Sequence, residues 1–142
     1  MAGIVCAIRG GPDSQSTIEA SINLARETGG TIHFLYVVNL DFLTLSTSSK
    51  TDRIREDMRG MGEFILIDAQ DKALRQGTRA ETVVSDGDVI DQIIALAKEK
   101  NARYVVLGTP VSEKENNLFT RNKSQAAAER ISSETQAEVV FS

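Results

Sequence analysis

The sequence contains one cysteine, one histidine, two prolines and no tryptophan. The single cysteine, Cys6, excludes an internal disulfide framework and a zinc site built on cysteine pairs. The single histidine, His33, excludes a histidine-cluster metal site and leaves most catalytic triads without their base. No run of about 20 apolar residues is present, so no membrane-spanning helix is predicted. The first residues also lack the pattern of a secretory signal.

The charge balance is mildly acidic, with 16 basic and 20 acidic residues and a net charge of −4. This balance argues against a nucleic-acid partner. Hydrophobic residues make up 41% of the chain and charged residues 25%, as in ordinary globular proteins. We therefore expect one soluble, cytoplasmic domain over residues 1–142, with no bound metal.

Short apolar runs rich in β-branched residues alternate along the chain with segments of helical periodicity. Strands are predicted around Ile4–Ile8, Thr31–Val38, Arg79–Ser85, Arg103–Gly108 and Glu138–Ser142. Helices are predicted after Asp13 or Ser14, over Asp52–Gln76, after Asp86–Asp88 and over Lys123–Thr135, with loops over Asn39–Thr51 and Thr109–Asn122. Such alternation predicts a parallel sheet with helices on both faces.

The predicted environment of several residues follows from the elements that contain them. The long helix carries an apolar stripe that is predicted to face the core: Ile54, Met58, Met61, Ile65, Ala69 and Ala73. Gly60 and Gly62 weaken that helix by up to about 1 kcal/mol each relative to alanine. Cys6 and His33 lie within apolar strands, where a buried thiol and a structural imidazole are expected.

The loop Arg9–Ser14 follows the first strand, and ligands of open parallel sheets bind beyond the carboxyl ends of the strands. Its two glycines and the helix N-terminus after it suit an anion. A plain strand-to-helix turn explains the same residues equally well. Arg9 fits either a solvent-exposed position, where it can pair with Asp13, or a contact to a phosphate or carboxylate.

The chain resembles the universal stress protein family over nearly its whole length. The matching pieces are Ile4–Ser14, Ala20–Ala25, Phe34–Val38, Ser85–Asp88 with Ile93, Ile94 and Ala97, Tyr104–Gly108, Ala128–Ile131 and Val139–Val140. The resemblance implies a Rossmann-like five-stranded parallel sheet in the order 3-2-1-4-5. It also implies a homodimer through the last strand, 138–142, and binding of ATP or AMP. The binding positions that it implies are Ala7, Ile8, Arg9, Gly10, Val37, Val38, Gly87, Leu107, Gly108, Thr109, Arg121 and Ser124.

Three departures separate this chain from the nucleotide-binding members of that family. Arg9 stands where those members carry an aspartate, and Val111 where the phosphate loop has its second glycine. No glycine follows Gly108, and Ser124 is the one serine that matches the end of the motif. Wrapping a phosphate requires glycines at positive φ. The departures predict a degraded or remodelled nucleotide or anion site and no catalytic residues.

Two other functions compete with this interpretation. Arg9–Ser14 also resembles the Ser-Gly-Gly-x-Asp-Ser loop of PP-loop ATP pyrophosphatases, although it lacks the opening serine. An ATP-using enzyme is therefore an alternative. The last strand, as an exposed edge, is compatible with a module that acts through association alone.

Overall fold

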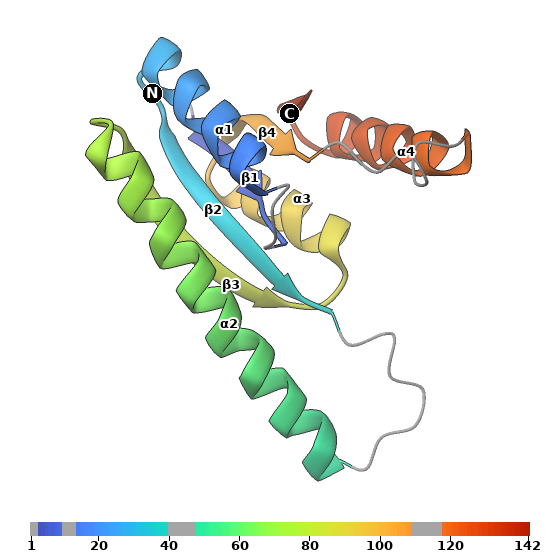
Figure 1. The fold of residues 1–142 in the computed structure, drawn as a ribbon. Helices are drawn as coiled ribbons and strands as arrows, with labels where there is room; N and C mark the ends of the chain where they lie inside the picture. Colours follow the sequence, from blue (N-terminus) through green and yellow to red (C-terminus); the bar gives the residue numbers. More distant parts are fainter. Residues whose placement is uncertain (1–2, 10–13, 40–47, 109–117) are drawn as a thin grey trace.

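A computed structural model describes residues 3–9, 14–39, 48–108 and 118–142, with only the backbone described for 48–50 and 118–124. Five strands alternate with four helices in the described residues (Figure 1). The strands are β1 (Gly3–Ala7), β2 (Thr31–Val38), β3 (Arg79–Asp86), β4 (Ala102–Leu107) and β5 (Glu138–Phe141). The helices are α1 (Ser14–Thr28), α2 (Ser48–Arg75), α3 (Val89–Glu99) and α4 (Leu118–Glu134).

All neighbouring strands are parallel, and their order is β3-β2-β1-β4-β5. This confirms the predicted fold. Cys6 of β1 lies opposite Phe34 of β2 and Val106 of β4, so β1 is the central strand. The connections run toward β3 on one side of β1 and toward β5 on the other. The strand order therefore reverses between β1 and β4, where such sheets bind ligands.

Alternation along the strands divides the core into two layers. Ile4, Cys6 and Ile8 belong to the apolar cluster that includes buried residues of α1 and α2. Val5 belongs to the cluster that includes buried residues of α3 and α4. Strands that are apolar on both faces are typical of a parallel sheet between two helical layers.

Helix α2 differs from the prediction in its start and in the face that it buries. It begins at Ser48, so the predicted loop to Thr51 is too long. Met61 was predicted in the core but is 61% exposed, whereas Leu66, which the predicted stripe omitted, is 1% exposed. The helix carries apolar residues around more than half of its circumference, and periodicity alone selects the wrong face for Met61.

The other helix boundaries follow local chemistry more closely. Asp88 is the N-cap of α3, and its side chain accepts a 3.0 Å hydrogen bond from the backbone amide of Asp91. Such side chains satisfy unpaired amides of the first turn, and this cap lies in the Asp86–Asp88 segment after which the helix was predicted. Helix α4 begins at Leu118 rather than Lys123. Residues 118–122, which were predicted to be part of an irregular loop, are therefore helical. Its first six residues are mostly polar, and polarity alone does not distinguish an exposed helix from a loop.

Candidate functional site

The carboxyl ends of β1 and β4 lie side by side at the point where the strand order reverses. Ala7 ends β1 and Leu107 ends β4. Beyond them, Ile8 still donates its amide to the Leu35 carbonyl oxygen at 2.9 Å, which holds the chain against β2. Arg9, the next residue, is exposed. An arginine thus stands just after the end of β1, at the position where the resemblance implies an aspartate.

Gly108 brings the end of β4 against the first turn of α1. A Cβ built on Gly108 would lie 3.1 Å from the Thr17 Oγ1 atom. That distance is too short for an unadjusted contact, so the close approach depends on glycine. The first turn of a helix presents unpaired backbone N–H groups and the positive end of the helix dipole. The geometry therefore places an anion-attracting helix end next to the reversal point.

Thr17 is the centre of a small buried polar group that the sequence analysis did not identify. Its hydroxyl shares a 2.9 Å hydrogen bond with the Ser142 hydroxyl, and its carbonyl oxygen accepts a 3.0 Å hydrogen bond from Ser21. The Cys6 thiol points to the same carbonyl oxygen at 3.8 Å. The available signal was the spacing of Ser14, Thr17 and Ser21, which places three hydroxyls on the buried face of α1.

A second set of contacts holds the carboxyl ends of β2 and β3. The amide of Gly87 donates to the Val38 carbonyl oxygen at 3.0 Å, and Gly87 has a φ of +132° that favours glycine. Arg59 of α2 lies 3.1 Å from the Asp86 carboxylate. These contacts fix the turn between β3 and α3 at the same edge of the sheet as Arg9.

The predicted site residues fall into three groups. The aliphatic ones are core residues: Ile8 and Val38 are buried toward α1 and α2, and Ala7, Val37 and Leu107 are half-buried toward α3 and α4. Arg9, Gly87 and Gly108 are exposed at the carboxyl edge. Gly10 and Thr109 lie outside the described residues. Arg121 and Ser124 lie in α4, where only the backbone is described.

Cys6 and His33 do not belong to this edge as reactive groups. Burial raises the pKa of the Cys6 thiol to about 12, so it is protonated at neutral pH and a poor nucleophile. His33 lies in the amino half of β2, with its Nδ1 atom 3.6 Å from a Glu81 carboxylate oxygen. Burial lowers the pKa of His33 from its usual 6.5, and Glu81 opposes that effect. Both side chains are buried, and their structural role stays a prediction.

The lowered pKa of His33 predicts a pH dependence of stability. Between the folded and the unfolded pKa the unfolded chain binds the extra proton, so the free energy of unfolding falls as pH falls below about 6.5. Glu99 favours and Lys100 disfavours the charged form, as weaker contributions. Urea unfolding at pH 7.5 and pH 5.5 should show a smaller loss of stability for His33→Gln than for the unmodified protein. Equal losses would contradict the assignment.

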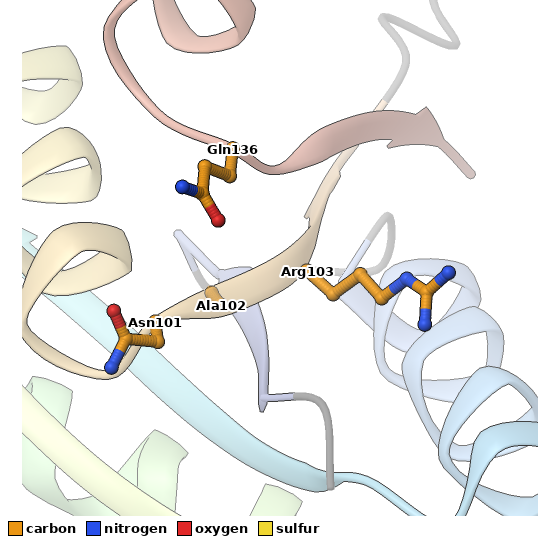
Figure 2. A pocket seen from close by; sticks show the side chains of 4 residues that line it. All are labelled: Asn101, Ala102, Arg103 and Gln136. Carbon is orange, nitrogen blue, oxygen red and sulfur yellow. The ribbon is translucent and has the colours of Figure 1, made fainter.

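A shallow hollow of about 360 Å³ lies at the opposite pole, lined by Asn101, Ala102, Arg103 and Gln136. These residues precede or begin β4 and β5, so the hollow is at the amino edge of the sheet. Figure 2 shows the Arg103 side chain pointing away from those of Asn101 and Gln136. The polar groups do not converge on one point, so the hollow is not assigned a ligand.

No group of three or more His, Cys, Asp or Glu side chains in the described ranges is placed to hold a metal ion. None of the helices in those ranges combines the length and the apolar character needed to cross a membrane.

The family model for the universal stress protein family matches residues 2–136. The chain belongs to that family. Universal stress protein YxiE of Bacillus subtilis is 31% identical over 116 residues, covering 75% of this chain and 77% of YxiE. This universal stress protein also shares its fold with UspA from Lactobacillus plantarum, at a TM-score of 0.78 and 14% identity. That match covers 99% of this chain and 96% of UspA.

A universal stress protein solved in complex with cAMP has the same fold as this chain. The TM-score is 0.71 at 16% identity, with 99% of this chain and 96% of the other covered. The fold and the family therefore agree with the resemblance that the sequence carries. The alternative identification of Arg9–Ser14 as a PP-loop stays a prediction, because residues 10–13 lie outside the described ranges.

Proposed function

We propose that this universal stress protein acts in the stress response as a non-catalytic module. Its ligand is an adenine nucleotide, bound through its phosphate at the edge formed by β1, β4 and α1. The observation that carries the proposal is the packing of Gly108 on Thr17, which sets the end of β4 beside the first turn of α1. Helix N-termini in this position bind phosphate groups in many α/β proteins.

Arg9 is the residue that we assign to the phosphate. It is exposed at the end of β1, one residue beyond the amide that Ile8 gives to Leu35. A guanidinium binds phosphate through two parallel hydrogen bonds. In this chain these bonds replace part of the phosphate binding that the two missing glycines of the phosphate loop would provide. The cAMP complex of a structural relative supports an adenine nucleotide as the ligand class.

The non-catalytic part of the proposal is supported by the position of His33. It lies on the amino half of β2, opposite Glu81 of β3, and is remote from the carboxyl edge. The Cys6 thiol is buried under α1. Neither group is placed to act as a base or a nucleophile on a phosphate beside Arg9. Steady ATP hydrolysis by the purified protein would contradict this part.

A thermal-shift screen with ATP, ADP, AMP, cAMP and inorganic phosphate tests the binding site, with calorimetry for any ligand that shifts the midpoint. A ligand at 100 times its dissociation constant adds about 2.7 kcal/mol to the free energy of unfolding. We expect one of the nucleotides to stabilise the protein. No shift with any of the five compounds would show that the site does not bind them.

Arg9→Ala tests the phosphate contact. Loss of a charge-assisted hydrogen bond of about 1.5–3 kcal/mol should weaken nucleotide binding roughly tenfold or more. Arg103→Ala is the matched control, since Arg103 is also exposed but lies at the amino end of β4. Equal affinities of the two variants would remove Arg9 from the site.

We also propose a homodimer through β5. This strand is an edge of the sheet, and Phe141 on it is 42% exposed. An edge strand presents unpaired backbone groups that bind another strand, and a second copy satisfies them with two-fold symmetry.

A further inference from the structure

The solvent-facing side of α2 carries most of the exposed apolar surface in the described part of the chain. Five large apolar side chains are exposed among the described residues, and four of them belong to α2. They are Met61, Phe64, Ile67 and Leu74, with exposed fractions of 55–77%. An apolar patch of this kind on a soluble protein marks an interaction site more often than an isolated exposed residue does.

Three of these four side chains form a continuous strip because of their spacing. Met61, Phe64 and Ile67 follow at intervals of three residues, so they are neighbours on the helix surface. Leu66, Ala69 and Ala73 on the other side are buried against the sheet. Figure 1 shows α2 along the outer side of β2 and β3, with its first turns extending past the ends of these strands. With 28 residues, at roughly 1.5 Å per residue, α2 is about 42 Å long.

A gap lies next to the most exposed side chain of this patch. Gly60 precedes Phe64 by four residues and therefore lies one turn away on the same side. A Cβ built on Gly60 would meet nothing within 4 Å, so the position is open to solvent. The helix thus presents an aromatic side chain, 77% exposed, beside a place with no side chain.

These features complement one another when two copies of α2 lie antiparallel. A two-fold axis at the level of residue 62 places Phe64 of each copy over Gly60 of the other. The same axis places Arg53 opposite Asp71, because both pairs are centred on residue 62. Arg53 is exposed, and the Asp71 side chain is 52% exposed and lies 3.0 Å from the Arg75 guanidinium of its own helix, so the contact across the pair would extend an existing ion pair. By helical periodicity, Arg53 and Asp71 lie on the same side of α2 as Phe64.

We infer that the outer face of α2 binds a second copy of this chain as an antiparallel helix pair. Phe64 fills the Gly60 gap, Met61 and Ile67 cover the flanks of that contact, and Arg53 pairs with Asp71 of the second copy. Insertion of one side chain into a gap of the facing helix is the usual way that paired helices pack. A two-fold contact of this type is self-complementary and needs no other partner.

This surface is separate from the proposed β5 contact. Helix α2 packs on β2 and β3, whereas β5 forms the opposite edge of the sheet. Both surfaces are therefore available on the same molecule, and a variant at one of them leaves the other in place. The inference does not depend on nucleotide binding.

Sedimentation velocity on the full chain over a range of concentrations tests the pairing. We expect Phe64→Glu and Gly60→Leu to weaken one association step by about tenfold or more. Gly60→Leu is the sharper variant, because leucine favours the helix and its Cβ enters open space. Circular dichroism on the same samples should show that both variants keep the fold. Unchanged association of both variants would overturn the proposal.

A charge exchange tests the geometry. Arg53→Glu and Asp71→Arg should each weaken association, and the double variant should recover most of the loss because the pair is rebuilt with opposite signs. Arg26→Glu, the same charge change at an exposed position of α1, should have no effect. No recovery in the double variant would reject the antiparallel register centred on residue 62.

Phe141→Glu separates the two surfaces. If it alone abolishes association while Phe64→Glu leaves it unchanged, β5 accounts for all pairing and the α2 proposal fails. If each variant removes a different step and the combined variant is monomeric, both contacts form. A monomeric unmodified protein would overturn the α2 pairing and the β5 dimer together.

Discussion

Replacing Leu66 by alanine will lower the free energy of unfolding by about 2–5 kcal/mol, the usual cost of removing a fully buried leucine side chain. Leu66 is 1% exposed in the cluster that joins α1 and α2 to the sheet. The change removes apolar contacts and leaves a cavity that its neighbours fill only in part. Urea unfolding followed by circular dichroism measures the loss.

Ile67→Ala is the matched control, one residue further along the same helix. Ile67 is 61% exposed, so its truncation should change the free energy of unfolding by no more than about 0.5 kcal/mol. Because Ile67 lies in the proposed α2 pairing surface, the variants are compared at a protein concentration at which sedimentation shows monomers. Equal losses at the two positions would show that α2 is rotated relative to the structure described above.

Replacing Gly62 by alanine will destabilise the protein, although alanine is the better helix former. A Cβ at position 62 would lie 2.3 Å from Cδ1 of Tyr36, whose side chain is itself buried. Tyr36 and α2 must then move apart, and overpacking of this kind costs about 1–3 kcal/mol. That cost exceeds the gain in helix propensity of at most about 1 kcal/mol.

The same replacement at Gly60 should have the opposite sign. Its Cβ meets nothing within 4 Å, so the gain of up to about 1 kcal/mol is not opposed. Thermal unfolding at a protein concentration at which sedimentation shows monomers should show a higher midpoint for Gly60→Ala and a lower one for Gly62→Ala. A rise for both variants would contradict the close contact between α2 and Tyr36.

The sequence was sufficient for the fold because its evidence is local and repeated. Apolar β-branched runs indicated the strands, and the turn Asp86–Asp88 indicated the start of α3, which Asp88 caps. The family resemblance implied the strand order, which the structure confirms. The strands and the cap need only residues that are close together in the chain, whereas the strand order rests on a resemblance over nearly the whole chain.

The errors concern the orientation and extent of polar or mixed helices. Gly60 and Gly62 are equivalent in the sequence as weak helix positions, yet only Gly62 contacts Tyr36. Met61 satisfies the same spacing as the core residues of α2 but faces solvent. Periodicity gives the repeat of a helix, and only the packing of the sheet decides which side is covered.

Several residues predicted for the site lie together at the carboxyl edge of the sheet, and their role in binding stays a prediction. Arg9 and Gly108 are exposed there, as expected for the ends of β1 and β4. Thr17 was missed because its role depends on Gly108 and on Ser142, which is 125 residues away in the chain. Contacts of that range are not encoded in any local pattern.

The hydrogen bond between Thr17 and Ser142 has a consequence for how the molecule opens. Ser142 also donates its amide to the Leu107 carbonyl oxygen, so the residue after β5 is tied to both α1 and β4. Separation of β5 from the sheet therefore also releases the Thr17 side chain beside Gly108. We expect hydrogen exchange to show the Ser142 amide opening together with the β5 amides, because one separation of β5 from β4 breaks both sets of hydrogen bonds.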